Sequence, residues 1–386
     1  MADSCDVIVV GCGLSGSVVA RYLAQKGKKV VIYERRNHIG GNMYDYIDNA
    51  GLRVHKYGPH VFHTYNESLK DYMLQYGEWT EFKITSRVNM LGKFTPSPFN
   101  FQTIDDYYPV NNAENLKKRL LEYYSGRTEA TIVELLESDD ELIKEYADFL
   151  FQNDYSLYTA KQWGISPKDI DPSVLKRVPV YFSYKDGYFN DTYQMVPIDG
   201  YTNWFRELLG HENIKVKLDY DAFKHLQITE NEVLIDGRKF DGLVVYTGAI
   251  DELFHGIYGS LPYRSLRFEW VSENKEKFQD AALVAYPAAK GFTRITEYSY
   301  FPQKSRAGKT SYAYEYPLIY GTSERIEPYY PVLTDDSKVQ YTKYEDLAKT
   351  IPNLVCVGRL AKFKYYNMDQ ALDAALKECE EIKHHI

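Results

Sequence analysis

The chain has 386 residues, of which 44% are hydrophobic and 26% charged, and its formal net charge at pH 7 is −8. This composition is ordinary for a folded protein, and the acidic balance argues against nucleic-acid binding and against anionic membrane surfaces. No apolar run approaches the roughly 18 residues that would span a bilayer, and the N-terminus lacks the cationic segment of a signal peptide. We therefore expect a cytoplasmic protein without membrane insertion, with about two or three domains.

The four cysteines, Cys5, Cys12, Cys356 and Cys379, include no CxxC pair and no pairing with histidine. They therefore predict neither a disulfide framework nor a metal site. Tyrosine is unusually frequent, with 37 residues against 18 Phe and 4 Trp. A tyrosine offers a stacking face and an uncharged hydroxyl, which suits a sugar-nucleotide groove, although compositional drift accounts for most of these residues.

The strongest local motif lies in the first 42 residues. Apolar runs at 7–10 and 30–33 predict two strands, and a glycine turn with a helical pattern lies between them. The second strand ends at Glu34, whose carboxylate can accept hydrogen bonds from ribose hydroxyls. Strand, glycine turn, helix, strand and acid together predict a dinucleotide site, although a purely structural βαβ unit is the alternative.

Each glycine of the turn has a separate physical reason. Gly11 permits the tight turn, Gly13 lets the backbone approach a pyrophosphate, and Gly16 lets helix and strand pack closely. The free N–H groups at the start of the helix then face the diphosphate.

The residues after Glu34 select the dinucleotide. The run from Arg35 to Asn42 contains Gly40-Gly41 and resembles the extension found in the glutathione-reductase-like class of FAD proteins. NAD sites usually lack this second glycine pair, so FAD is favoured over NAD. The cofactor residues expected from this segment are Gly11, Gly13, Leu14, Ser15, Gly16, Glu34, Arg35, Gly41 and Asn42.

Hydrophobic periodicity predicts the other elements in chain order. Helices are expected at 66–77, within 103–163, at 202–209 and at 368–382; strands at 79–99 (with a turn at Gly92), 214–218, 243–247 and 354–356; and period-two alternation between 263 and 318. The fold class is therefore α/β, with a Rossmann-like FAD-binding domain, a helical insertion and an antiparallel β-sheet domain.

We expect three domains. The FAD-binding domain takes residues 1–78, 206–260 and 345–386; the helical domain takes 101–165, with a mobile lid at 166–190; the antiparallel sheet domain takes 79–100, 191–205 and 261–344. The lid is expected because the loop-rich stretch is long and carries Arg177, and such stretches are often functional.

A distinctive segment runs from Tyr57 to Thr64 and contains His60 and His63. Residues three apart on a strand cannot both face one side. Taken alone, the segment reads as a turn with surface histidines.

Several motifs in one order resemble the UDP-galactopyranose mutase family across essentially the whole chain. They are the glycine turn with Gly40-Gly41-Asn42, the Tyr57–Thr64 segment, Tyr158-Thr159-Ala160-Lys161-Gln162-Trp163-Gly164, Leu175-Lys176-Arg177, Thr293-Arg294-Ile295-Thr296-Glu297, Tyr329-Tyr330-Pro331 and Gly358-Arg359. Their joint order is more specific than any one motif.

The resemblance implies an isomerase that interconverts UDP-galactopyranose and UDP-galactofuranose for cell-surface polysaccharide synthesis, such as O-antigen. It implies that FAD is active in the reduced form, with its N5 attacking the anomeric carbon, and that no net redox occurs. Its implied partners are a nucleotide sugar, a reductant such as NAD(P)H or a reductase, and a second copy in a homodimer.

The resemblance also assigns roles to residues. Catalytic positions are Arg177, Arg294, His60 and His63; substrate-binding positions are Tyr158, Thr159, Trp163, Arg177, Tyr188, Arg294, Tyr330, Tyr365, Ser86 and Ala285; the flavin end is Arg359, Met368 and Asp369. Cations and hydroxyls suit a departing diphosphate, which develops negative charge. Each residue alone has a plainer alternative; Arg294, for example, could pair with Glu297 or Glu315.

The chain departs from the family pattern at several sugar and base positions. Ser86 and Ala285 stand where family asparagines contact the sugar, and Asn367, Asp154 and Tyr181 are further departures. A dTDP-fucopyranose mutase is therefore the alternative substrate reading, whereas the residue type at His60 disfavours UDP-N-acetylgalactosamine. An amine-oxidase-like flavin oxidoreductase and a non-catalytic flavin scaffold are alternatives of other classes; neither explains the arginines and tyrosines.

Overall fold

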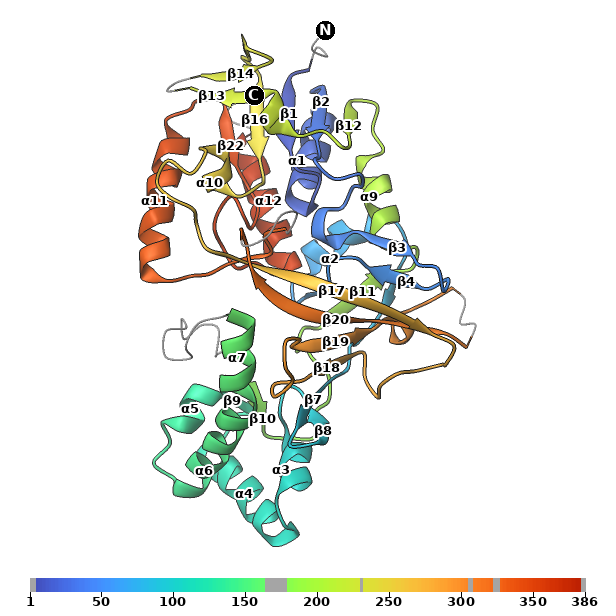
Figure 1. The fold of residues 1–386 in the computed structure, drawn as a ribbon, viewed down its shortest axis with the longest axis vertical. Helices are drawn as coiled ribbons and strands as arrows, with labels where there is room; N and C mark the ends of the chain where they lie inside the picture. Colours follow the sequence, from blue (N-terminus) through green and yellow to red (C-terminus); the bar gives the residue numbers. More distant parts are fainter. Residues whose placement is uncertain (1–4, 164–178, 230–231, 305–307, 322–326, 383–386) are drawn as a thin grey trace.

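The computed structural model describes residues 5–163, 179–229, 232–304, 308–321 and 327–382. A parallel sheet with flanking helices forms one end, a long sheet crosses the middle, and a group of helices forms the other end (Figure 1).

The parallel sheet has the order β12-β2-β1-β16-β22, and all neighbouring pairs are parallel. Its strands are β1 (Val7–Val10), β2 (Val30–Tyr33), β12 (Ile214–Lys217), β16 (Leu243–Tyr246) and β22 (Leu354–Cys356). The strands are apolar runs because helices cover both faces. This is the predicted Rossmann-like domain.

The two faces of this sheet belong to different hydrophobic cores. Val9 packs in the core beneath α1 (Leu14–Gln25), α9 (Tyr201–Leu209) and α12 (Met368–Ile382). Its neighbour Ile8 packs in the core beneath α10 (Ile250–Leu253) and α11 (Asp335–Lys349). Successive strand residues point to opposite faces, so each short strand serves both cores.

Two helices differ from expectation. α11 was not predicted, because most of its residues are polar and it buries few side chains, among them Tyr344 and Ala348. Its start is fixed locally by a capping box on Thr334. The predicted helix at α9 is present, and Trp204 and Phe205 belong to the core of the parallel sheet. We expected a domain boundary after residue 205, which would have placed these two residues with the antiparallel sheet.

The large sheet has the order β21-β17-β20-β19-β18-β7-β8. Its strands are β21 (Tyr330–Pro331), β17 (Tyr263–Glu273), β20 (Thr310–Ile319), β19 (Arg294–Glu297), β18 (Leu283–Ala285), β7 (Ser86–Met90) and β8 (Lys93–Pro96). The long β17–β20 pair crosses the middle of the molecule (Figure 1). The pairs are antiparallel, as predicted, except that β7 runs parallel to β18.

The helical insertion has its own core. Its elements are α3 (Phe101–Tyr107), α4 (Val110–Tyr123), β9 (Glu129–Thr131), α5 (Ile132–Leu136), α6 (Glu141–Leu150), the π-helical turn η2 (Phe151–Tyr155), α7 (Ser156–Trp163) and β10 (Pro179–Tyr181). β10 lies within the expected lid, yet it pairs with β9, and Val180 and Tyr181 are buried. This part of the segment is therefore packed into the helical domain.

Smaller elements complete the chain. They are η1 (Gly41–Met43), β3 (Asp45–Ile47), β4 (Arg53–His55), β5 (Phe62–Thr64), α2 (Glu67–Leu74), β6 (Trp79–Glu81), β11 (Tyr193–Pro197), η4 (Ala222–Lys224), β13 (Leu226–Ile228), β14 (Val233–Ile235), β15 (Arg238–Lys239) and η5 (Tyr298–Tyr300). β11 joins β5 and β6 in a three-stranded sheet, so β6 is separate from the large sheet in which it was expected.

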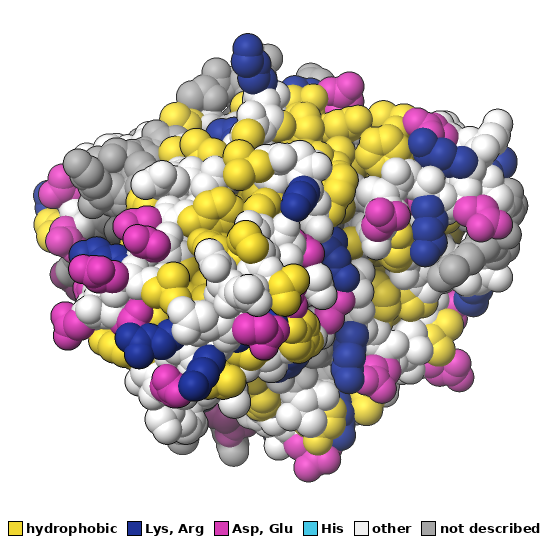
Figure 2. All heavy atoms as spheres, turned by 90° about the horizontal axis from the view of Figure 1, so that it is seen from below, with side chains coloured by type: hydrophobic (Ala, Val, Ile, Leu, Met, Phe, Trp, Pro, Cys, Tyr) yellow, Lys and Arg dark blue, Asp and Glu magenta, His cyan; other side chains and the backbone are white. Residues whose placement is uncertain are grey.

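The surface gives little sign of a polyanion partner on the face that Figure 2 shows, because Lys and Arg side chains are interspersed there with Asp and Glu. Among the described residues, no helix has both the length and the apolar character needed to cross a membrane. The same part of the chain holds no cluster of three or more His, Cys, Asp or Glu that could bind a metal ion.

Candidate functional site

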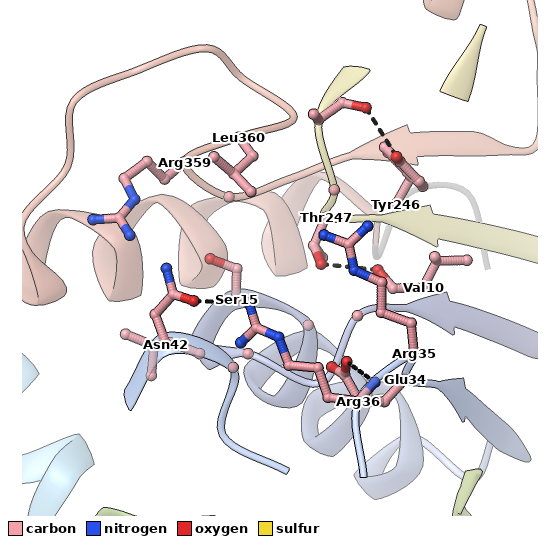
Figure 3. Close-up of a pocket in the computed structure, with 18 of the residues that line it drawn as sticks. Val10, Ser15, Glu34, Arg35, Arg36, Asn42, Tyr246, Thr247, Arg359 and Leu360 are labelled. Atoms are coloured by element: carbon pink, nitrogen blue, oxygen red, sulfur yellow. Dashed lines mark hydrogen bonds between the residues drawn. The ribbon is translucent and has the colours of Figure 1, made fainter. Parts of the chain in front are cut away.

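A pocket lies at the carboxyl ends of the parallel strands, around the turn that follows β1 (Figure 3). Open α/β sheets place ligands at this edge. All the predicted cofactor residues line it except Asp369. Asp369 lies in the first turn of α12, directly after Met368, which does line the pocket.

The glycine turn leaves no room for side chains. Gly11 has φ +103°, and a Cβ there would lie 2.1 Å from Thr247 Oγ1. A Cβ on Gly16 would lie 2.2 Å from the Gly11 carbonyl oxygen, and one on Gly41 would lie 2.8 Å from Gly13 Cα. Two loops therefore meet backbone against backbone, which is the close approach that a dinucleotide pyrophosphate needs. The cradle fits a flavin dinucleotide.

Glu34 has a structural task besides the expected one. Its buried carboxylate accepts hydrogen bonds from the N–H of Cys12 at 2.8 Å and of Arg36 at 2.9 Å. Glu34 therefore braces the glycine turn against the end of β2. Each carboxylate oxygen has a second acceptor position, and the residue lines the pocket, so it can also accept from ribose hydroxyls.

The two arginines after Glu34 are already paired at the pocket. Arg35 donates to Glu327 at 2.7 Å, and Arg36 pairs with Glu327 at 2.9 Å and donates to Asn42 at 2.9 Å. Figure 3 shows Arg36 between Asn42 and Glu34. Burial alone would raise the pKa of Glu327, but Arg36 and Arg35 outweigh burial and hold this pKa at about 2. Arg35 also pairs with Glu252 at 3.5 Å, so two carboxylates face the two cationic charges.

At the other end of the pocket, His60 lies near Arg359 and the start of α12. Burial, with smaller contributions from His55 and Arg359, lowers the pKa of His60 to about 3, so the ring is neutral at pH 7. Its Nδ1 lies 2.8 Å from the Gly58 carbonyl oxygen and donates to it, which leaves Nε2 as an acceptor. The N-terminus of α12 at Met368 contributes a positive dipole end.

A second group of residues lies on one face of the large sheet. Paired residues on neighbouring strands project from the same face. The register pairs Arg294 with Glu315 and with Ala285, and it pairs Tyr330 with Arg264.

The same register joins these pairs into one face. Phe268 pairs with Glu315 and lies four residues after Arg264, so both project to this side. Ser86 pairs with Leu283, which lies two residues before Ala285. We name this side the arginine face; it carries Ser86, Ala285, Arg294, Glu315, Arg264 and Tyr330.

Arg294 is the central cation of the arginine face. Its Nη2 donates to Glu315 at 2.6 Å, whereas its buried Nε has no hydrogen-bond partner among the described residues. Burial alone would lower the pKa of Arg294, but Glu315 outweighs it and holds the pKa above its usual value. The Arg294 side chain is 23% exposed, so the accessible part of its guanidinium can meet an anionic ligand.

Helix α7 brings Tyr158 to the arginine face. Burial raises the pKa of Tyr158, and Arg294 opposes this shift while Tyr188 adds to it. The three side chains therefore lie within electrostatic reach of one another. Thr159 is buried on the same helix.

Tyr330 links the arginine face to the pocket. Its ring stacks on Tyr365 at 4.5 Å between centroids, and the guanidinium of Arg359 lies 4.4 Å from the Tyr330 centroid. Because Arg359 also lines the pocket, the cofactor cradle and the sheet face form one continuous site.

Comparison of the sequence with known proteins identifies the family of the chain. The sequence model of UDP-galactopyranose mutase matches residues 153–365, and that of an NAD(P)-binding Rossmann-like domain matches 9–76. The dTDP-fucopyranose mutase of Escherichia coli is 34% identical over 379 residues, covering 97% of both chains. The chain belongs to the UDP-galactopyranose mutase family. It is therefore an isomerase.

Other relatives agree with this family. A probable UDP-galactopyranose mutase of Klebsiella pneumoniae is 35% identical over 97% of this chain and 94% of its own. The crystal structure of a reduced UDP-galactopyranose mutase has a TM-score of 0.72 at 16% identity, covering 99% of this chain and 94% of its own. By contrast, human flavin-containing amine oxidase B is 37% identical over only 18% of this chain. The sequence likeness to this amine oxidase is thus confined to a short segment, and the likeness to flavoproteins supports a flavin cofactor.

Three of the predicted catalytic or substrate-binding residues are not placed by the structure at this continuous site. His63 does not line the pocket: its Nδ1 lies 2.8 Å from Asp191 Oδ2, and its ring stacks on Phe189 at 3.7 Å. It thus contacts Asp191 and Phe189 and not the pocket that His60 lines. Arg177 and the side chain of Trp163 lie outside the described residues.

Four of the residues that line the pocket at the parallel strand ends were not identified from the sequence. Thr247 and Gly248 follow β16, and Tyr220 and Phe223 follow β12; all four line the pocket. The signal was available, because both segments follow predicted strands of the parallel sheet, and ligands gather at those strand ends.

Proposed function

We propose that this chain is a flavin-dependent mutase that interconverts UDP-galactopyranose and UDP-galactofuranose. The observation that carries the proposal is the continuity, through Arg359 and Tyr330, between a dinucleotide cradle and a sheet face with an unpaired buried arginine donor. Reduced FAD would supply the nucleophile for the anomeric carbon and be regenerated when the ring has closed.

The cradle residues bind and orient the cofactor. Backbone N–H groups at the start of α1 would meet the FAD pyrophosphate, and Glu34 would accept from ribose hydroxyls. At the flavin end, the N-terminus of α12 favours the negative charge of a reduced flavin. Neutral His60 offers an acceptor there without adding a positive charge.

The arginine face binds the leaving diphosphate. Arg294, whose side chain is 23% exposed, would donate from its guanidinium while Glu315 holds that group in place. Tyr330 lies beside the cation of Arg359 and adds a hydroxyl donor. Arg177 is proposed as a second cationic donor on the strength of the family motif. These donors would stabilise charge that appears only as the sugar–phosphate bond breaks.

A second candidate substrate is dTDP-fucopyranose. Ser86 is buried and Ala285 half-buried, and both lie on the arginine face as short side chains. A site without hydrogen-bonding arms no longer penalises a sugar that lacks a hydroxyl. A 6-deoxy sugar would therefore leave no buried polar group unsatisfied.

The test uses purified flavoprotein reduced with dithionite and kept without oxygen. We expect each nucleotide sugar that is a substrate to reach a pyranose–furanose equilibrium without stoichiometric consumption of reductant. Reductant consumed with every turnover would contradict the mutase. Comparing kcat/KM for UDP-galactopyranose and dTDP-fucopyranose ranks the two substrates; a preference for the first above about tenfold, or about 1.4 kcal/mol, would exclude the second.

The remaining features of the proposal come from the family resemblance. They are a reductant such as NAD(P)H or a reductase, a homodimer, a cytoplasmic location and a role in cell-surface polysaccharide synthesis. Reduction of the bound flavin by NADPH and the mass of the protein in solution would test the first two.

A further inference from the structure

Helix α7 is attached to the large sheet through Lys161. Its Nζ donates hydrogen bonds to the carbonyl oxygens of Tyr286, Ala289 and Phe292, at 2.7, 2.8 and 2.9 Å. Three bonds use every N–H donor of an ammonium group. The side chain is therefore committed to one geometry.

The three carbonyls belong to the turn between β18 and β19. This turn begins directly after Ala285 and ends just before Arg294, which are both on the arginine face. On the other side of the contact, Tyr158 lies one helical turn before Lys161. Lys161 therefore joins the segment that carries Tyr158 to the turn that sets Arg294.

A fourth hydrogen bond reaches the same residue of α7. Arg264 Nη2 donates to the Lys161 carbonyl oxygen at 3.3 Å, and Arg264 is the register partner of Tyr330. The end of α7 is thus fastened both to the β18–β19 turn and to β17. Burial lowers the pKa of Lys161 to about 8, which still leaves the ammonium form predominant at pH 7.

We propose that Lys161 is a positioning residue for substrate binding, which fastens α7 to the β18–β19 turn so that Tyr158 and Arg294 meet the same nucleoside diphosphate. The nature of the ligand rests on the proposed function. Without this contact, ligand binding would have to order α7, and the conformational entropy lost in that step would weaken the affinity. The chemical step depends on groups that Lys161 does not touch.

The test compares Lys161→Met, Lys161→Arg and the control Lys118→Met in the flavin-loaded enzyme. Lys118 lies on α4, is 74% exposed and pairs only loosely with Glu122 at 3.7 Å. For Lys161→Met we expect the Kd of UDP and the KM to rise about tenfold, equivalent to about 1.4 kcal/mol, with kcat changed by less than about threefold and the flavin spectrum unchanged. Lys161→Arg, which keeps a charged donor, should recover part of the affinity, and Lys118→Met should match the wild type.

Hydrogen exchange makes the test independent of the ligand. Lys161→Met should speed amide exchange in α7 and in residues 286–292, while exchange in β1 and α1 stays as in the wild type. Wild-type UDP affinity in Lys161→Met, or unchanged exchange in both segments, would overturn the proposal. If the wild type itself neither binds UDP nor converts a nucleotide sugar, the proposed function fails. The exchange data still decide whether Lys161 holds α7 against the β18–β19 turn.

Discussion

The cofactor cradle and the arginine face are built in different ways. The cradle is mainly backbone: Gly11, Gly16 and Gly41 allow loops to approach at distances that any side chain would block. The arginine face consists of side chains, and its members come from strands between Ser86 and Tyr330. A backbone site is specified by a short stretch of sequence, whereas a side-chain site depends on how distant strands are aligned.

Their electrostatics differ in the same way. At the cradle, Arg35 and Arg36 share Glu327 and Arg35 also pairs with Glu252, so two carboxylates face the two cations before any ligand binds. On the arginine face, Glu315 pairs with one end of Arg294 and leaves Nε unpaired. The cradle is suited to a ligand that stays bound, and the arginine face to a charge that develops during the reaction.

The largest effect is expected from a side chain in the cradle. Gly11→Ala would place a Cβ 2.1 Å from Thr247 Oγ1 at a φ of +103°, so the turn must open. We expect the purified variant to lack flavin, and hence activity. The measurement is the ratio of flavin to protein absorbance.

Gly27→Ala is the matched control. Gly27 also has a positive φ, +82°, but a Cβ there would meet no atom within 4 Å. It should lose some stability, about 1–2 kcal/mol, and keep its flavin. A Gly11→Ala protein with one flavin per chain would refute the account of the cradle.

On the arginine face, Arg294→Ala should spare the flavin and slow turnover. Loss of one donor to a developing charge costs about 2.7–4 kcal/mol, or roughly a hundred- to a thousand-fold in kcat. Removing the cation also leaves Glu315 buried without its ion pair, so melting temperature must be measured beside kcat.

Arg267→Ala is the control for charge removal. Arg267 is exposed and lies three residues after Arg264 on β17, so it projects from the opposite face. It should turn over like the wild type. Near-normal kcat in folded, flavin-loaded Arg294→Ala would show that Arg294 does not stabilise the charge that develops in the reaction.

A smaller effect is expected in the sugar subsite of the same face. The double change Ser86→Asn and Ala285→Asn adds two amide arms beside Arg294. We expect the ratio of kcat/KM for UDP-galactopyranose over dTDP-fucopyranose to rise by about tenfold, since an amide that finds no hydroxyl partner is penalised. An unchanged ratio, in a variant that melts like the wild type, would place sugar recognition elsewhere.

The smallest effect on turnover is expected from a change near Tyr158 that acts on stability instead. Burial raises the pKa of Asp154 to about 7 from an ordinary value of 3.8. The folded state therefore holds a proton that the unfolded state releases, so the free energy of unfolding should fall as pH rises from about 4 to about 7. Asp154→Asn should remove this part of the pH dependence. Equal slopes in wild type and variant, measured by urea unfolding, would show that the carboxyl is not held protonated.

Local sequence was sufficient for the first 42 residues. The apolar runs, the glycines and Glu34 act on neighbours a few residues away, so strand, turn, helix and most of the cofactor residues could be predicted. Periodicity likewise predicted a helix at 66–77, and α2 begins there behind Asn66, whose side chain caps it. The residues after β12 and β16 were missed although both strands were predicted, because the sequence does not show which side chains at those strand ends reach the pocket.

For the other half of the site, the sequence determined residue types and their order, which was enough to indicate the mutase family. It left open whether Arg294 would pair with Glu297 or Glu315. Strand register decided this: Arg294 lies opposite Glu315, whereas Glu297 turns inward and accepts from Ser299 and other donors. Only the tertiary structure could also bring Lys161 to the β18–β19 turn, more than a hundred residues away. Such contacts depend on the alignment of whole strands and helices, and no short stretch of sequence contains that information.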